Sequence, residues 1–217
     1  MRAVIFDLWD TLVLWSSEGH TEQMAQAAAH VGVEAEALRR AFEATHHERS
    51  VGPLLDNVRA VLETLGVDGA QAEAVAAVRR DHTRTVLVPR DGAIETLEEL
   101  GRRGFARGLI SVCSSDVEDV WEETPLAREL DDVVLSCTVG IRKPDPAVYL
   151  LSCERLGVEP HECLFVGDGA NDELAGAERV GMRSACILRP GAEEALWPEA
   201  RGWEPTIRDL REVLDLV

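Results

Sequence analysis

Short apolar runs recur along the chain, and this recurrence is the feature that most constrains its fold. The first run, Arg2 to Phe6, is rich in β-branched and aromatic residues and shows no alternation of apolar and polar positions. Such a run is typical of a strand buried on both faces of a parallel sheet. Four similar runs follow: Ala106 to Ser111, Val133 to Ser136, Cys163 to Gly167 and Ser184 to Leu188. Since helical or mixed segments separate them, the chain is predicted to be an α/β protein.

The segments between these runs carry helix signals. Three of them end just before a glycine, a common stop signal for a helix. They are Gly92 to Arg103, Pro146 to Leu156 and Asp172 to Val180. A last helix is expected from about Thr206 to Leu216. The core is therefore predicted to be a Rossmann-like parallel sheet covered by helices.

The pattern changes between the first strand and Gly92. This stretch holds no convincing strand and is instead rich in Ala, Leu, Glu and Arg, with glycines as breaks. Four helices are expected in it: Thr21 to Val31, Glu34 to Glu48, Leu54 to Leu65 and Ala70 to Thr83. We therefore expect an α/β core made of residues 1–14 and 90–217, with an inserted small four-helix cap domain, residues 15–89. The cap is expected to move about linkers near Leu14 to Ser17 and Pro89 to Asp91.

Composition narrows the classes of protein to which the chain can belong. Its 217 residues are 46% apolar, enough for one substantial core and a smaller appended unit. The 40 acidic and 22 basic residues give a formal net charge of −18, which repels phosphate backbones, so no nucleic-acid partner is expected. No apolar run approaches the roughly 20 residues that cross a bilayer, and a secretory signal is not expected before the first strand. A cytoplasmic protein without a membrane partner is expected.

The cysteines and histidines show no pattern of a metal site. The five cysteines are odd in number and form no C-x-x-C pair, which argues against a disulfide framework and a structural zinc site. They are expected to be reduced and mostly buried thiols. His46 and His47 are adjacent, so on a helix they would point about 100° apart and are not expected to share a metal.

Polar clusters follow the predicted strands, where ligands of a parallel sheet bind. The first begins at Asp7, directly after the first strand. Four such clusters appear in order: Asp7 to Leu12, Ser111 to Ser115, Arg142 to Asp145, and Gly167 to Glu173. In this order and spacing, with a helical cap after the first cluster, the whole chain resembles the haloacid dehalogenase superfamily of hydrolases.

The resemblance implies a role for each cluster. Asp7 would be a covalent nucleophile that forms an aspartyl-phosphate, since a cation can align a carboxylate with an electrophilic phosphorus. The Ser111 hydroxyl would hold a phosphoryl oxygen, and Lys143 would supply positive charge. Mg²⁺ would be the cofactor, bound by Asp7, Asp168 and the backbone carbonyl of Trp9.

The acid that completes this metal site is ambiguous. Asn171-Asp172 fits the motif, whereas counting back from Ala175-Gly176-Ala177 favours Glu173. We favour Glu173 and keep Asp172 as a candidate that would otherwise cap the following helix.

The remaining candidates are residues expected to contact the substrate. These are Trp9, Thr11, Val112 and Trp15.

Lys143 stands out within this chain. It is the single lysine among 22 cationic residues, the others being arginine. A compact ammonium can contact two oxyanions where a planar guanidinium would crowd them. The one lysine therefore lies at the place where the implied chemistry requires it.

Trp9 breaks the family pattern. Phosphatases of the superfamily carry a second Asp two residues after the nucleophile, which protonates the departing alcohol, and an indole cannot do this. The favoured hypothesis is a Mg²⁺-dependent hydrolase of a small phosphate ester that prefers good leaving groups. The first alternative is a 2-haloacid dehalogenase, because those relatives also carry an aromatic residue here; they work without metal and lack the acid that matches Asp168. The second alternative is a catalytically weak protein that only binds a phosphorylated ligand.

Overall fold

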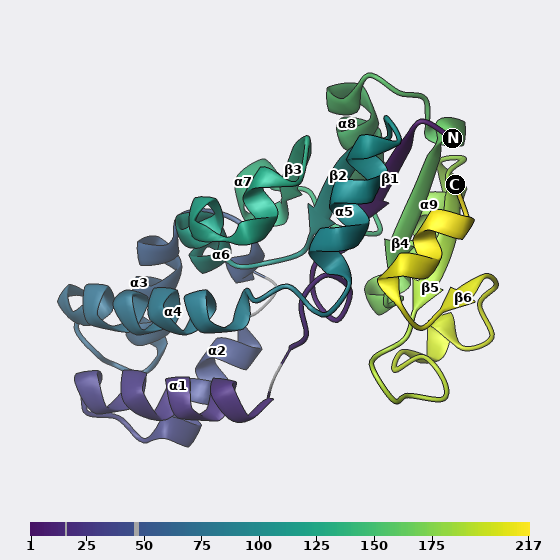
Figure 1. Cartoon of the computed structure of the whole chain (residues 1–217). Helices are drawn as coiled ribbons and strands as arrows, with labels where there is room; N and C mark the ends of the chain where they lie inside the picture. Colours follow the sequence, from purple (N-terminus) through teal and green to yellow (C-terminus); the bar gives the residue numbers. More distant parts are fainter. Residues whose placement is uncertain (16, 46–47) are drawn as a thin grey trace.

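The computed structural model describes residues 1–15, 17–45 and 48–217. Within these residues, a six-stranded, all-parallel sheet forms in the order β3-β2-β1-β4-β5-β6 (Figure 1). The strands are β1 (Ala3–Phe6), β2 (Ala106–Ser111), β3 (Asp132–Leu135), β4 (Cys163–Gly167), β5 (Arg183–Ile187) and β6 (Thr206–Ile207). The first five lie at the predicted apolar runs, which confirms the α/β fold.

The register of the sheet aligns the carboxyl ends of its central strands. Phe6 of β1 pairs with Leu109 of β2 on one side and with Val166 of β4 on the other. The strand order reverses at β1, and in sheets of this kind ligands bind at the carboxyl edge beside such a switch point. Asp7, directly after β1, lies at this point.

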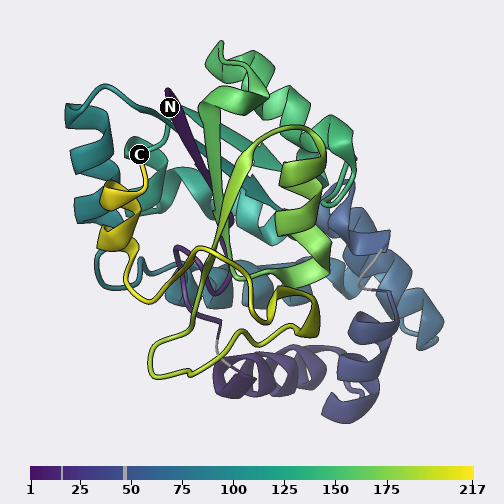
Figure 2. The same cartoon turned by 90° about the vertical axis from the view of Figure 1, so that its right-hand side faces the viewer.

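The sheet is covered on both faces (Figure 2). Val4 and Phe6 of β1 pack into one apolar cluster, whereas Ala3 and Ile5 pack into another, as expected of alternating side chains on a strand. The main helices of the first cluster are α5 (Ala93–Arg102) and η8 (Leu210–Asp215), and those of the second are α8 (Pro146–Leu156) and α9 (Glu173–Arg179). In Figure 2 the teal α5 and yellow C-terminal turn lie on one side of the sheet and the green helices on the other.

A helical insertion follows β1, as predicted. It contains α1 (Ser17–Val31), α2 (Ala35–Ala44), α3 (Leu54–Thr64) and α4 (Ala72–Val86), with the short 3₁₀ turns η1 (Glu48–Ser50) and η2 (Gly69–Gln71). These helices bury their own apolar cluster, in which Leu38, Phe42 and Val58 are central. The second helix, expected to reach Glu48, ends at Ala44. His46, His47 and Ser16 of the first linker lie outside the described residues.

Arginines of α4 join the insertion to the core. They pair with acids on two short elements after β2, α6 (Ser115–Val120) and η3 (Trp121–Glu123). The shortest N–O distances are 2.9 Å for Arg79–Asp116, 3.2 Å for Arg80–Asp119 and 2.8 Å for Arg84–Glu123. The first pair is buried and the others are exposed to different degrees. These charged contacts, one of them a buried ion pair, therefore join α4 to the core.

The predicted last helix, Thr206 to Leu216, is present only as the 3₁₀ helix η8, and its first residues are not helical. Thr206 and Ile207 form β6, because the sheet edge at β5 offers backbone partners: Cys186 N donates to Pro205 O at 3.0 Å and Leu188 N to Ile207 O at 2.9 Å. The 3₁₀ helix η8 starts only after Asp209, whose side chain accepts from the Arg211 amide and which forms a capping box with Glu212.

Further short elements complete the chain. They are η4 (Pro125–Arg128), α7 (Ser136–Val139), η5 (Pro160–Glu162), η6 (Ala170–Asp172) and η7 (Pro198–Ala200). All five cysteines are buried free thiols. Among the described helices, none combines the length and the apolar character that a membrane span requires.

Candidate active site

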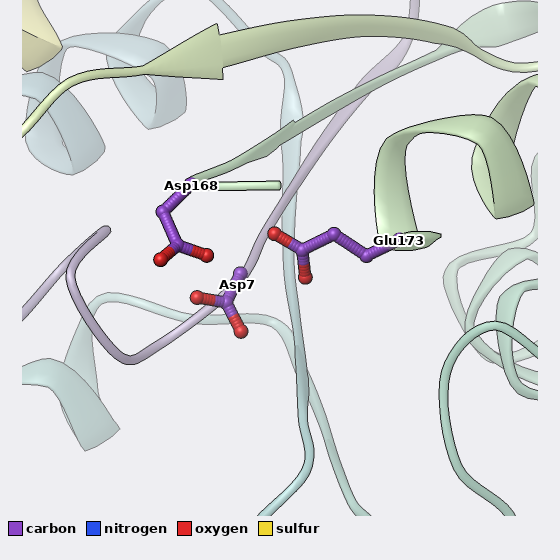
Figure 3. A group of neighbouring side chains, drawn as sticks. All are labelled: Asp7, Asp168 and Glu173. Atoms are coloured by element: carbon purple, nitrogen blue, oxygen red, sulfur yellow. The ribbon is translucent and has the colours of Figure 1, made fainter. Parts of the chain in front are cut away.

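Three carboxylates meet at the carboxyl end of the sheet. Asp7 follows β1, Asp168 follows β4, and Glu173 is the first residue of α9; their carboxylates converge (Figure 3). One oxygen of each lies within 4.8 Å of the others, and all three residues are buried. Ionised carboxylates at this separation repel one another unless cations lie among them.

Lys143 supplies one positive charge. Its Nζ lies 2.5 Å from Asp7 Oδ1 and 2.5 Å from Glu173 Oε2. Burial by itself would lower the pKa of Lys143, but the charges of Asp7 and Glu173 outweigh it and raise that pKa above its ordinary value. Lys143 therefore stays positively charged beside Asp7.

One ammonium does not balance three carboxylates. Burial, and then the charge of Asp7, raise the pKa of Asp168 to about 6. Burial also raises the pKa of Glu173 well above its usual range, despite the attraction of Lys143. A second cation would relieve this excess of negative charge, and carboxylate oxygens are the ligands that Mg²⁺ prefers. The donor set of Asp7, Asp168 and Glu173 thus fits a hard divalent cation.

Gly167 gives Glu173 the space to enter this cluster. A Cβ on Gly167 would lie 2.1 Å from Glu173 Oε1, so only a residue without a side chain allows this approach. Glu173 Oε1 also accepts a hydrogen bond of 3.0 Å from the Gly169 amide, and the Tyr149 hydroxyl donates to the Glu173 backbone carbonyl at 2.8 Å. The position of Glu173 is therefore fixed from three sides.

The loop before α9 turns Asp172 away from the cluster. Asn171 and Asp172 both adopt left-handed backbone angles, with φ of 56° and 55°. Asp172 is exposed and lies outside the three-carboxylate cluster, where Glu173 is found. The expectation that Asp172 instead caps the following helix is also wrong: it occupies the N-cap position, but its side chain makes no capping hydrogen bond.

The loop after Asp7 is held by Asp10. This residue has a left-handed φ of 56°, and its Oδ1 accepts from the Trp15 amide at 3.1 Å and pairs with Arg189 at 2.9 Å. The loop also closes on itself, since the amides of Leu12 and Val13 both donate to the Leu8 carbonyl. The Asp10 carboxylate is therefore engaged in holding the loop.

Two predicted site residues have buried hydroxyls without partners. Thr11 and Ser111 are almost fully buried, and among the described residues neither Thr11 Oγ1 nor Ser111 Oγ has a hydrogen-bonding partner of ordinary geometry. Ser111 ends β2 and Thr11 lies in the loop after β1, so both belong to the carboxyl edge of the sheet. Buried hydroxyls usually find a partner, so these two are available to a bound ligand.

Trp9, Val112 and Trp15 lie together between the insertion and the core. All three line one cavity, and Val112 also lines the neighbouring recess beside Lys143. Trp9 is partly buried, and Trp15 is 45% exposed. The predicted substrate contacts therefore flank the carboxylate cluster on the side of the insertion, apart from Thr11, which is buried in the loop.

Sequence reasoning missed Trp197. Its Nε1 donates to Asp168 Oδ2 at 2.7 Å, while the Ala170 amide donates to Asp168 Oδ1 at 3.1 Å. Trp197 lies between β5 and β6 in a segment without regular periodicity, and no motif marks it. Only its place in the folded chain shows that it contacts the site.

These features define a class of protein: an α/β protein with a parallel sheet, a helical insertion after its first strand and a strand-end aspartate at the centre of its site. The sequence model of haloacid dehalogenase-like hydrolases matches residues 1–181, and the chain belongs to this family.

Similar proteins agree with this assignment. The chain is 30% identical over 233 residues to a glyceraldehyde 3-phosphate phosphatase of Methanopyrus kandleri, which covers 100% of this chain and 97% of that protein. It is 37% identical over 103 residues to the (S)-2-haloacid dehalogenase 4A of Burkholderia cepacia, which covers 46% of this chain and 43% of that protein. The crystal structure of a HAD phosphatase from Thermococcus onnurineus has the same fold, with a TM-score of 0.72 and 23% identity over 100% of this chain and 97% of that one.

Proposed function

We propose that this protein hydrolyses small phosphate esters, with Asp7 as the nucleophile and Mg²⁺ as the cofactor. The observation that carries the proposal is the convergence of Asp168 and Glu173 on Asp7, because two acids beside a nucleophile serve a metal-assisted reaction. The similarity along the whole chain to a glyceraldehyde 3-phosphate phosphatase supports the same reaction class.

In this proposal each residue has a distinct task. An oxygen of Asp7 attacks the phosphorus, the bond to the alcohol oxygen breaks, and water later hydrolyses the aspartyl-phosphate. Lys143 neutralises charge on Asp7 and on the phosphoryl group, and the hydroxyls of Ser111 and Thr11 donate to phosphoryl oxygens. Mg²⁺, held by Asp7, Asp168, Glu173 and the Trp9 carbonyl, would act as a Lewis acid on the phosphoryl group.

We also propose that residues 15–89 act as the cap of this site. The insertion has its own apolar cluster and meets the core at the cavity beside Trp9, so it lies where substrate must enter. Motion about the two linkers would admit substrate and then exclude water.

Dehalogenation of a 2-haloacid is the second candidate, and Trp9 favours it. A halide leaves without a proton, so an indole two residues after the nucleophile does no harm there. The similarity to a haloacid dehalogenase over 103 residues is in line with it. Against it stand the buried acids Asp168 and Glu173, which crowd Asp7 with negative charge that a metal-free reaction does not need.

One assay separates these candidates. Phosphate release from an aryl phosphate is measured with Mg²⁺ and with excess chelator, and halide release from a 2-haloacid is measured in parallel. We expect phosphate release only with Mg²⁺, and its loss in Asp7→Asn while the circular dichroism spectrum is unchanged. The matched control is Asp172→Asn, an exposed acid of the same motif outside the cluster. Halide release in chelator would establish the dehalogenase, and neither product would indicate a ligand-binding protein.

A further inference from the structure

A cavity lies between the insertion and the core, next to the carboxylate cluster. It has a volume of about 220 Å³ and reaches from Trp9 and Val112 at the core to α1 and α4 of the insertion. Because Val112 also lines the recess beside Lys143, the cavity adjoins the place where a phosphoryl group would react. A substrate bound at Asp7 would extend its remaining part into this cavity.

The cavity is lined by cationic and titratable basic groups in a strongly acidic protein. Arg49, Arg79, His20 and His82 contribute to its wall, and Asp116 is the one carboxylate among the lining residues that the structure describes. The formal charge of the whole chain is −18, so this concentration of basic side chains is local. A cavity of this kind attracts an anionic ligand.

Asp116 does not balance the charge of both arginines in the cavity wall, because it already forms an ion pair with Arg79. Arg79 Nη2 lies 2.9 Å from Asp116 Oδ1 and donates to Ser114 Oγ at 3.0 Å, while the Thr83 hydroxyl donates to Asp116 Oδ2 at 2.7 Å. The Nε of Arg79 is nevertheless buried without a hydrogen-bonding partner among the described residues. Arg79, a residue of the cavity wall, thus keeps one buried donor unsatisfied within the described residues.

Arg49 is a buried cation without a paired anion. It is 7% exposed, and its side chain donates hydrogen bonds to two neutral acceptors: Nη2 to the Phe42 carbonyl at 2.6 Å and Nε to Thr45 Oγ1 at 3.1 Å. Within residues 1–15, 17–45 and 48–217, no carboxylate forms an ion pair with it. Asp116 and Glu48 favour its charge electrostatically without forming an ion pair with it, and a buried charge without a direct partner is costly.

The two guanidinium groups both contact one aromatic ring. The Cζ atoms of Arg49 and Arg79 lie 4.6 Å and 4.9 Å from the ring centroid of Phe42. Burial, and then the charge of Arg79, lower the pKa of Arg49 to about 10, so Arg49 remains protonated at neutral pH. Arg49 and Arg79 thus both belong to the cavity wall and contact the same ring, and an anion bound in the cavity would offset their like charges.

We infer that this cavity binds a carboxylate carried by the same substrate whose phosphoryl group reacts at Asp7, with Arg49 as its main partner. The substrate is then a phosphate ester that also bears a carboxylate. This inference rests on the proposed phosphatase function and adds the substrate class. A planar carboxylate suits a guanidinium, since both can form two parallel hydrogen bonds.

The test compares two aryl phosphates of equal leaving-group acidity. They are 3-(carboxymethyl)phenyl phosphate and 3-ethylphenyl phosphate, and 3-(phosphonomethyl)phenyl phosphate serves as a third probe. We expect kcat/KM to favour the carboxymethyl ester over the ethyl ester by about 10- to 100-fold, the size of one charge-assisted hydrogen-bonded pair. A stronger preference for the phosphonomethyl ester would replace carboxylate with phosphoryl as the bound group. Equal rates for all three would overturn the inference.

Variants assign the preference to Arg49. In Arg49→Met the ratio between carboxymethyl and ethyl esters is expected to fall to about 1, and in Arg49→Lys to an intermediate value, because the charge remains without the planar fork. Arg59→Met is the matched control: Arg59 is an exposed arginine of α3 paired with Asp56 of its own helix, and the ratio should stay at that of the wild type. An unchanged ratio in folded Arg49→Met would contradict the assignment.

A binding measurement makes the test independent of turnover. Calorimetry with 3-hydroxyphenylacetate, which has no phosphoryl group, is run on the wild type, Asp7→Asn and Arg49→Met. We expect binding to the first two and a loss of about 10-fold or more in Arg49→Met. If 3-hydroxyphenylacetate binds through Arg49 but no ester is hydrolysed, the proposed phosphatase function is contradicted and the anion site is supported. If the esters are hydrolysed but 3-hydroxyphenylacetate does not bind, the phosphatase function is supported and the anion site is contradicted.

Discussion

The indole Nε1 of Trp197 donates a hydrogen bond of 2.7 Å to Oδ2 of Asp168. Because the Ala170 amide holds Oδ1, both oxygens of Asp168 are oriented by the protein itself. The segment between β5 and β6 thereby reaches back over the carboxyl end of the sheet. Asp168 is presented to the other two carboxylates in a fixed geometry, and Trp197 is a positioning residue for it.

Trp197→Phe is expected to weaken Mg²⁺ binding. Removing a group that orients a metal-binding carboxylate typically costs about 10- to 100-fold in metal affinity. Calorimetric titration with Mg²⁺ measures the change directly. The matched control is Trp203→Phe, since the Trp203 indole donates at 3.0 Å to Ser184 Oγ and not to the cluster. Tighter Mg²⁺ binding in Trp197→Phe would mean that the indole competes with the metal for Asp168.

Gly167→Ala is expected to disable the site while leaving most of the fold. The new Cβ would meet Glu173 Oε1 at 2.1 Å, so Glu173 must leave the position in which it contacts Lys143. We expect a loss of at least about 10-fold in both Mg²⁺ affinity and turnover, because Glu173 is proposed as a metal ligand. The control is Gly69→Ala, where the added Cβ meets only Arg59 at 3.4 Å. Wild-type activity in Gly167→Ala would show that Glu173 is dispensable.

Asp116 is expected to make the free energy of unfolding of the chain depend on pH in the acid range. Burial by itself would raise the pKa of Asp116, but Arg79 and the hydroxyls of Ser114 and Thr83 outweigh burial and lower it from 3.8 to about 2. The pKa of Asp116 is lower in the folded chain than in the unfolded chain. Its contribution to the free energy of unfolding is therefore complete above about pH 4 and is lost as the pH falls towards 2. Its size is about 2 kcal/mol.

Urea unfolding at pH values from 6 down to 2 measures this contribution. The free energy of unfolding of Asp116→Asn should be lower than that of the wild type at pH 6, and the difference should shrink as the pH falls. Asp81→Asn is the control: Asp81 pairs with Arg84 of its own helix and its side chain is 78% exposed, so its curve should run parallel to that of the wild type. A constant difference between Asp116→Asn and wild type would contradict the acid linkage.

Much of the fold was predictable because its signals are local. A strand buried on both faces must be apolar throughout, and a helix that stops at a glycine leaves a short motif, so β1 to β5 and most long helices could be found. The two residues of β6 carry no such signal. Thr206 and Ile207 become a strand only because β5 offers an unpaired edge.

The site residues also fall into two groups, those that local sequence signals identify and those that only the folded chain identifies. Asp7, Lys143 and Asp168 are found from motif order, since each follows a predicted strand or stands in a compact cluster. The choice between Asp172 and Glu173 depends on the left-handed turn before α9 and on the missing side chain of Gly167, which spacing alone does not reveal. Contacts across long sequence separations, such as Trp197 with Asp168, leave no trace in a single sequence.

The sharpest prediction concerns Trp9 and the leaving group. If Trp9 removes the acid that protonates the departing oxygen, its absence matters only when that oxygen leaves badly, and general acid catalysis is typically worth about 100- to 10,000-fold. Aryl phosphates should therefore be hydrolysed far faster than alkyl phosphates of similar size, and the rate should fall steeply as the leaving-group pKa rises. Asp10 does not compensate, because its carboxylate is engaged by the Trp15 amide and Arg189. Turnover is measured across a series of aryl and alkyl phosphates for the wild type and for Trp9→Asp, which should flatten the dependence by restoring a proton donor. A flat dependence in the wild type would mean that another group donates the proton, and the account of Trp9 would be wrong.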